Sequence, residues 1–175
     1  MHSNGQVAFL ARYKGGKRDG PMASWFEKGQ KKAEGIFKND KEIGLWTFWH
    51  ENGHKNAEEN YKNGKFHGLN IHWYANGQKE QEGVFKDGKK NGPAKSWYRN
   101  GRRRNEGNFN AGKLNTSVLW KPNGERCPVS NPFDGSGFLV RYNDDGTELS
   151  RAIYQDGEFK AKVESESDYS LRESP

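Results

Sequence analysis

Five glycines at one fixed spacing constrain this chain more than any other feature of its sequence. Gly5, Gly29, Gly53, Gly77 and Gly101 lie 24 residues apart, and an Asn precedes four of them. Each interval repeats an aromatic residue eight positions after its glycine and a Trp four positions before the next one. A fixed period in this range is the signature of repeat architectures. The chain is therefore predicted to stack copies of one small structural unit.

Two turn signals in each unit divide it into two strands. Asn52–Gly53 is the residue pair preferred in two-residue type I′ hairpin loops, because both central residues need a positive φ. The second junction, as in residues 86–89 (Lys-Asp-Gly-Lys), suits a type I turn followed by a left-handed glycine and a bulge. No stretch shows sustained helical periodicity. Each unit is therefore predicted to be a β-hairpin with strands of about six to eight residues.

Composition limits how such hairpins can pack. Hydrophobic residues make up 31% of the chain and charged residues 30%, which is too polar for a thick core between two layers. Aromatic residues make up 13%, more than a disordered chain would carry. We therefore expect an all-β fold, an elongated single-layer antiparallel β-meander or solenoid. Five hairpin repeats are expected in residues 5–125, degenerate repeats capping the same sheet in residues 126–159, and a disordered acidic tail in residues 160–175.

The expected strand register assigns aromatic side chains to both faces of the sheet. If residues 52–53 form the loop, Trp46 lies opposite Glu59 and Trp49 lies opposite Asn56. Alternation of side chains then sorts the strands into two faces, with Tyr61, His50, Phe48 and Trp46 on one and Trp49, Thr47, Leu45 and Glu58 on the other. Room for neighbouring rings is expected at three glycines, which are Gly35, Gly83 and Gly107.

The repeated unit resembles a known family. The pattern G-x-K-x-x-E-G-x-F-K-x-G-K-x-x-G-x-W-x-x-W-Y-x-N-G, best matched in residues 29–53 and 77–101, resembles the MORN-repeat variant. The resemblance covers residues 5–125 strongly and 126–159 weakly. It implies a twisted sheet of hairpins that acts as an interaction surface without catalytic residues, and bacterial proteins with this variant are often labelled antitoxins of toxin–antitoxin systems. The chain departs from the pattern at the inner aromatic position that Trp46 fills, where it has Met22, Asn70 and Ala94.

No constellation in the sequence has the geometry of a catalytic, metal or cofactor site. His50 and His54 have the spacing of a helical metal site, but a turn separates them and places them on opposite faces. Cys127 is the sole cysteine, which excludes an internal disulfide and a cysteine-based zinc site. The adjacent carboxylates Glu58 and Glu59 point to opposite faces of a strand and cannot converge. We therefore expect no enzyme activity, no cofactor, no metal and no small-molecule substrate.

The charge pattern is basic but periodic in both signs. The formal net charge is +6, and Lys or Arg recurs at positions 31, 55, 79 and 103 while Glu recurs at 34, 58, 82 and 106. A basic stripe interleaved with aromatic residues could hold nucleic acid or an anionic membrane. Glutamates at the same period indicate that much of the stripe is paired within the chain, which disfavours nucleic acid. Anionic membrane lipid is kept as the alternative ligand.

The sequence therefore predicts a non-enzymatic scaffold that binds another protein, with a toxin as one candidate partner from the resemblance. Interfaces favour Trp, Tyr and Arg, although packing of ring against ring inside the sheet is the competing role for each aromatic. A cytoplasmic location is expected because the first eight residues lack the apolar stretch of a signal peptide, while an export signal on a longer chain stays open. The residues expected to bind the partner are Trp25, Phe26, Trp49, Trp73, Tyr74, Trp97, Tyr98, Arg102 and Arg103.

Overall fold

The structure is a computed structural model that describes residues 3–128 and 134–164. Every regular element in these two ranges is a β-strand. No helix in the described ranges is long and apolar enough to cross a membrane. The chain divides into two compact units, Met1–Lys89 and Lys90–Pro175, and each is described by itself.

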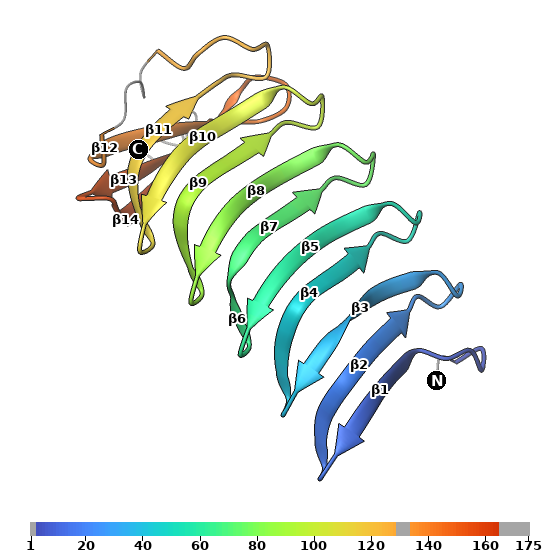
Figure 1. Cartoon of the computed structure of the whole chain (residues 1–175). Coiled ribbons are helices and arrows are strands. Elements are labelled where there is room, and N and C mark those ends of the chain that lie inside the picture. The colour runs from blue at the N-terminus through green and yellow to red at the C-terminus, as the bar shows by residue number, and fades with distance from the viewer. Residues whose placement is uncertain (1–2, 129–133, 165–175) are drawn as a thin grey trace, which may run out of the picture. The chain divides into compact units, whose positions relative to one another are not determined.

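The first unit is a meander of antiparallel strands that follow one another in sequence order (Figure 1). A short strand, β6, continues the pairing along β5 where β7 leaves it. The expected all-β meander of hairpins is therefore confirmed, and in this unit it is a single layer. The strands are β1 (Phe9–Lys14), β2 (Lys17–Trp25), β3 (Lys31–Lys38), β4 (Lys41–Trp49), β5 (Lys55–Lys62), β6 (Lys65–Phe66), β7 (Gly68–Trp73) and β8 (Lys79–Lys86).

The two kinds of turn are the reverse of those predicted. At the inner junctions the central residues have positive φ, 53° at Asn63 and 77° at Gly64, as a two-residue type I′ turn requires. At the Asn-Gly junctions only the glycine has a positive φ, 84° at Gly53. There the N–H of Gly53 donates to the carbonyl of His50, and the N–H of His50 donates to the carbonyl of His54. The Asn-Gly pairs therefore belong to three-residue loops with a left-handed glycine at the third position.

Hydrogen bonding explains why Asn stands in these three-residue loops. The Oδ1 atom of Asn52 accepts a hydrogen bond from the N–H of His54 at 3.1 Å, which closes the loop from inside. Its Nδ2 atom donates at 2.7 Å to the carbonyl of Ala75, which lies in the next three-residue loop along the sheet. Asn100 makes the same pair of bonds, to Arg102 N–H and to the Pro122 carbonyl. Each Asn therefore joins its own loop to the following one.

The strand register is confirmed in part. Trp46 lies opposite Glu59 as expected, but a shift between Phe48 and Trp49 places Trp49 opposite Lys55, not Asn56. The shift follows from the longer loop, which takes one more residue out of the pairing. We call one face of this sheet the packed face, because it buries Ala33, Phe37, Trp46, Ala57, Glu59 and Asn70. We call the other the open face, and it carries Leu10, Ile36, Leu45, Thr47 and Leu69.

Aromatic rings form a continuous row on the packed face of the first unit. Their centroids are 4.8 Å apart for Phe37 and Trp46 and 6.2 Å apart for Trp46 and Tyr61. The row continues through Phe66 to Phe85. Offset and edge-to-face contacts of this kind add roughly 0.5–1.5 kcal/mol each beyond the burial of area. The row supplies the cohesion that a single-layer sheet otherwise lacks.

Two of the glycines expected beside rings can be compared with their surroundings. A Cβ atom on Gly35 would lie 2.2 Å from the indole of Trp46, so the prediction is confirmed there. It is wrong at Gly107, where the neighbours are the Thr116 carbonyl and the Leu114 side chain. Ala94 lies opposite Gly107 and brings no ring to this position.

The second unit contains two antiparallel sheets. Its β12–β14 strands form a sheet of their own and do not continue the pairing of β9 to β11. That residues 126–159 cap the repeats stays a prediction. After Leu119, Trp120 and Arg126 form one isolated bridge, and apolar side chains of β11 and β12 pack together. The strands are β9 (Lys89–Trp97), β10 (Arg103–Asn110), β11 (Lys113–Leu119), β12 (Gly137–Tyr142), β13 (Glu148–Gln155) and β14 (Glu158–Glu164). The buried cluster consists of Leu114, Leu119, Cys127, Leu139 and Val140.

The boundary expected for the acidic tail was also too early. β14 runs to Glu164 and pairs with β13 along its length, so residues 160–164 are strand. Residues 165–175 of the expected tail lie outside the described residues.

Candidate functional site

Three of the predicted tryptophans line up on the first unit. Trp25, Trp49 and Trp73 each end a strand just before a three-residue loop and are partly buried. A lysine side chain extends from each of the first two tryptophans to the ring of the next one. Lys31 lies opposite Trp25 in the strand register, and its Nζ atom is 5.4 Å from the ring of Trp49. Lys55 repeats the arrangement between Trp49 and Trp73, with its Nζ atom 5.9 Å from the second ring.

The same lysines are neutralised by glutamates three residues farther along. Lys31 pairs with Glu34 at 2.7 Å and Lys79 with Glu82 at 2.8 Å. Lys55 and Glu58 form the equivalent pair. The expectation that much of the basic stripe is paired within the chain is therefore confirmed. We call these tryptophans, lysines and glutamates the tryptophan row: Trp25, Trp49, Trp73, Lys31, Lys55, Lys79, Glu34, Glu58 and Glu82.

The other aromatic residues of the predicted site immediately precede the three-residue loops. Phe26 holds the ammonium of Lys32 5.6 Å above its ring. Tyr74 occupies the same position two repeats later and is partly buried. Tyr98 is 1% exposed, and its hydroxyl donates at 2.7 Å to the carbonyl of Trp120. Tyr98 therefore supports the stacking of the loops and offers almost no surface to a partner.

The remaining predicted residues belong to the second unit and contact their own neighbours. Arg103 pairs with Glu106 and places its guanidinium carbon 5.9 Å from the ring centroids of both Trp97 and Trp120. Arg102 is exposed and donates to the Pro122 carbonyl at 3.3 Å. The structure thus brings the predicted residues together in one row only on the first unit.

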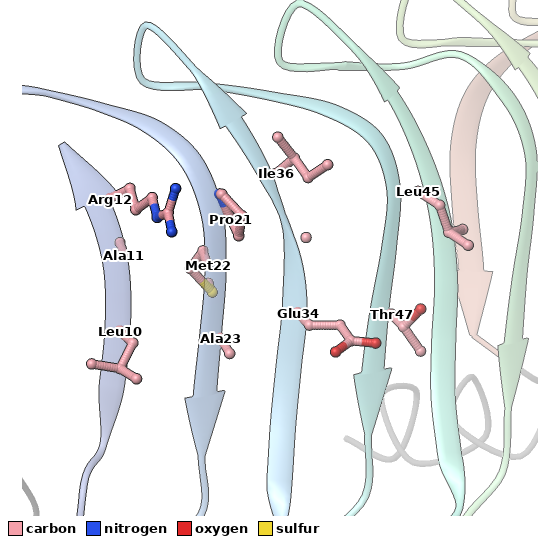
Figure 2. Close-up of a pocket in the computed structure, with 11 residues that line it drawn as sticks. Leu10, Ala11, Arg12, Pro21, Met22, Ala23, Glu34, Ile36, Leu45 and Thr47 are labelled. Carbon is pink, nitrogen blue, oxygen red and sulfur yellow. The ribbon is translucent and has the colours of Figure 1, made fainter. Parts of the chain in front are cut away.

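A groove of about 640 Å³ lies on the open face beside the tryptophan row (Figure 2). The repeat pattern explains why it forms over β1 to β4. Leu10 stands at the position that is Glu34 in the next repeat, which makes this end apolar, and Ala23 stands where Thr47 does, which leaves space. Arg12 extends toward Pro21 at its margin. The lining residues are Leu10, Ala11, Arg12, Pro21, Met22, Ala23, Glu34, Gly35, Ile36, Leu45 and Thr47.

Large aliphatic side chains are exposed in the groove and, at Leu69, beyond it on the open face. Leu10 is 58% exposed, Leu45 51%, Leu69 46% and Ile36 45%. The sequence analysis did not identify these side chains as binding residues. Leu45 and Leu69 are 24 residues apart, so their recurrence at the repeat period was visible in the sequence. We call Leu10, Ile36, Leu45 and Leu69 the aliphatic strip. Large apolar side chains gathered on one exposed face mark candidate interaction sites.

Sequence reasoning also missed a second basic feature, at the two-residue turns. Lysines form directly opposed pairs there, and all of them are exposed. Lys38 donates to Asp19 at 3.1 Å, and this hydrogen bond holds the pKa of Asp19 below its usual value. The other members have no ion pair within the described residues. We call the pairs the lysine row: Lys14 and Lys17, Lys38 and Lys41, Lys62 and Lys65.

A polar cluster lies beside the aromatic row on the packed face. Tyr61 donates its hydroxyl to Glu59 at 2.7 Å, and His72 Nε2 lies 3.3 Å from the same carboxylate. Burial alone raises the pKa of Glu59, but the hydrogen bonds from His72 and Tyr61 outweigh it, so the pKa lies below its usual value. Asn70 Nδ2 and Trp46 Nε1 are buried without hydrogen-bond partners within the described residues. Glu59 stands where the neighbouring repeats have glycine.

The histidines considered for metal binding hold the loops together instead. His50 Nε2 lies 2.9 Å from the Trp73 carbonyl, and His54 Nδ1 lies 2.9 Å from the Ala75 carbonyl. Within residues 3–128 and 134–164, no group of three or more His, Cys, Asp or Glu side chains could hold a metal ion.

A family model described as the MORN repeat variant matches residues 42–63 and 66–87. Residues 42–87 thus match two consecutive MORN repeats. MORN repeats are generally associated with binding of proteins or membrane lipid, and their families are typically non-enzymatic scaffolds. No curated protein matches the chain.

The two matched MORN repeats coincide with structural units. The first covers nearly all of β4 and β5 with the loop between them, and the second covers β7 and β8. Each contains one tryptophan of the tryptophan row, Trp49 or Trp73, and one leucine of the aliphatic strip, Leu45 or Leu69. The candidate surface is therefore built from the repeated positions of the MORN unit itself.

Proposed function

We propose that the open face of residues 3–89 binds a partner protein, with the aliphatic strip as the centre of the contact. The observation that carries the proposal is the contrast between the two faces. On the packed face Trp46 and Phe37 are each 3% exposed, whereas on the open face Leu45 is 51% exposed. Apolar side chains that recur on one exposed face are better explained by a protein contact than by packing within the chain.

The groove and the tryptophan row support the same surface. The groove gives a partner side chain a concave place to enter, and buried central contacts of this type contribute most of the binding energy in protein interfaces. Trp49 and Trp73 lie beside the strip with part of each ring accessible. Their lysine and glutamate neighbours form a polar rim of paired charges, which adds orientation more than affinity.

Charge substitutions in the strip test this proposal. Leu45→Asp and Leu69→Asp place carboxylates at the centre of the surface, while each side chain is exposed enough for the sheet to fold. Affinity capture from the source cell, followed by mass spectrometry, is expected to recover a stoichiometric protein with the wild type and to lose it with either variant. Leu149→Asp is the matched control, because Leu149 is 41% exposed in the second unit.

Two measurements keep the result interpretable. Circular dichroism and thermal melting must show that the variants fold like the wild type. Capture that is unchanged in Leu45→Asp and Leu69→Asp would exclude the open face as the protein-binding surface.

We propose a narrower form of this function on the resemblance alone, an antitoxin or immunity type of protein that blocks the activity of its partner. This form predicts that the captured protein impairs growth when expressed without the chain and that co-expression relieves the effect. A captured protein without any toxic effect would remove the antitoxin role and leave protein binding intact.

Anionic membrane lipid is the second candidate ligand, and the lysine row is the observation that favours it. Unpaired lysines beside exposed leucines could contact anionic headgroups and the upper acyl region. This reading predicts co-sedimentation with vesicles that contain an anionic lipid and release by salt. Co-sedimentation that is equal for neutral and anionic vesicles would contradict it.

A further inference from the structure

The aliphatic strip of the first unit is bounded on its two long sides by charge. Along β3, Glu34, Ile36 and Lys38 alternate onto the same face, with the isoleucine midway. Residues four apart in a strand are separated by about 13 Å. The open face therefore forms a channel about 13 Å wide between the glutamates of the tryptophan row and the lysine row.

The two walls of this channel differ in free charge. Glu34, Glu58 and Glu82 are each paired with a lysine of the tryptophan row, so that wall is close to neutral. The opposite wall consists of lysines, of which Lys38 alone has a carboxylate partner among the described residues. Like charges directly opposite each other destabilise a hairpin. Protection of sheet edges against aggregation does not explain these opposed lysine pairs, because the turns that carry them connect paired strands.

The period of the walls is fixed by backbone hydrogen bonds. The N–H of Asp40 donates to the Arg18 carbonyl, and the N–H of Gly64 donates to the Glu42 carbonyl, each at 2.9 Å. Successive two-residue turns therefore stack at a distance of two strands, which is about 9.6 Å. The leucines of the aliphatic strip, Leu45 and Leu69, repeat at the same distance because they occupy equivalent strand positions.

This spacing matches an α-helix laid across the strands. Residues seven apart on a helix are about 10.5 Å apart along its axis, and a helix with its side chains is about 10–12 Å thick. A partner strand fits less well, because its side chains on one face are about 6.7 Å or 13.4 Å apart. Recognition of a helix through apolar residues in a groove is a common mode of peptide binding.

We propose that the occupant of the open face is an amphipathic α-helix of a partner protein, and this inference rests on the protein-binding function proposed above. The helix crosses the strands, and apolar residues seven apart contact Leu45 and Leu69. A further apolar residue, three or four positions before the one at Leu45, contacts Ile36 one strand away. Its acidic flank faces the lysine row. The opposite flank faces the paired glutamates and needs no excess of charge. The channel therefore also determines which flank of the helix faces the lysine row.

Two synthetic peptides test the proposal. Both are capped 21-residue helices with leucines in a heptad pattern, and they differ only in one flank, which carries glutamates in the first and lysines in the second. Fluorescence anisotropy with the full chain is expected to show binding of the acidic peptide about tenfold tighter than of the basic one, the sum of several exposed ion pairs. The preference is expected to shrink as salt rises.

Matched triple variants locate the contact. Lys17→Gln/Lys41→Gln/Lys65→Gln removes three charges from the lysine row and is expected to abolish the preference for the acidic peptide. Lys31→Gln/Lys55→Gln/Lys79→Gln removes the same number of charges from the tryptophan row and is expected to keep the affinity for the acidic peptide, while the glutamates it frees strengthen binding of the basic one. Circular dichroism checks that both triple variants fold.

Several outcomes would overturn the helix proposal. They are absence of binding to either peptide, equal binding of the two, and an equal loss in both triple variants. Lysine-row-dependent binding of anionic vesicles or single-stranded RNA without peptide binding would also overturn it, in favour of a membrane or a nucleic acid. If Leu45→Asp still loses the captured protein while the acidic peptide fails, the protein-binding function stands and only the helix is wrong.

Discussion

The indole of Trp46 occupies the space that a side chain on Gly35 would need. A Cβ atom built on Gly35 would lie 2.2 Å from a ring atom of Trp46, far inside contact distance. The ring also lies 4.8 Å from Phe37 by centroids. The glycine on β3 and the tryptophan on β4 are therefore one packing unit, and neither can change alone.

Gly35→Ala is accordingly expected to destabilise the first unit by about 1–3 kcal/mol, because the added methyl group overpacks the site. The free energy of unfolding in urea measures the loss. The double variant Gly35→Ala/Trp46→Leu removes the clash and is expected to recover part of it relative to the two single changes. Strictly additive losses in the double variant would contradict the pairing of these two residues.

Asn52→Asp isolates the bond between successive three-residue loops. The variant keeps the acceptor for the His54 N–H but loses the amide donor to the Ala75 carbonyl. Loss of this bond is expected to cost about 0.5–1.5 kcal/mol in urea unfolding. Asn63→Asp is the matched control, because the side chain of Asn63 has no hydrogen bond to any described residue and Asp tolerates its left-handed conformation. Equal effects of the two substitutions would show that charge, not the loop-to-loop bond, is responsible.

The polar cluster around Glu59 predicts a pH dependence. A carboxyl group whose pKa is lower in the folded chain contributes stability above its unfolded pKa, about 4.3 for Glu. That contribution is lost as the pH falls below this value through the lower folded pKa. Glu59→Gln is therefore expected to be less stable than the wild type near pH 7, by about 1–3 kcal/mol.

The stability difference between wild type and Glu59→Gln is expected to shrink as the pH falls from 4.3 toward 3. Thermal melting across this range measures it. Glu51→Gln, at an exposed loop residue, controls for the general effect of acid. A difference that stays constant with pH would show that the stabilising form of Glu59 is not the ionised one.

The second unit depends on a buried cluster in a way that the first does not. Leu139 is 5% exposed on β12, whereas Leu149 on the neighbouring β13 is 41% exposed. Leu139→Ala is expected to cost about 2–5 kcal/mol and Leu149→Ala well under 1 kcal/mol in urea unfolding. Similar losses for the two would mean that the β12–β14 sheet does not bury Leu139 as described.

The hairpin architecture could be predicted from the sequence because the period and the turn residues are local signals. The turn types could not, since a positive φ at Asn63 and a side-chain bond at Asn52 both select Asn. Only the position of the next loop, which supplies the Ala75 carbonyl, distinguishes the two roles. The same dependence on tertiary contacts hid the separate sheet of the second unit, where the spacing of the repeat is lost.

The candidate site was predictable in part for a related reason. The tryptophans at positions 49 and 73 could be recognised by residue type. The exposure of Leu45 and Leu69, in contrast, depends on which face of the sheet packs its aromatic rings against one another. Asn70 shows the limit most clearly. It stands in a tryptophan position, yet it is buried and accepts the Asn60 N–H at 2.8 Å where the partner of β5 changes from β7 to β6.

The loop-to-loop bonds have a consequence for how such a chain can change over time. Asn52 and His54 both bond to the backbone carbonyl of Ala75, and a backbone acceptor is present whatever residue occupies that position. A duplicated 24-residue segment would therefore meet ready-made acceptors on its neighbour. Gene duplication could lengthen the sheet by one hairpin without new contacts having to evolve, and the side chains of the open face would stay free to diversify.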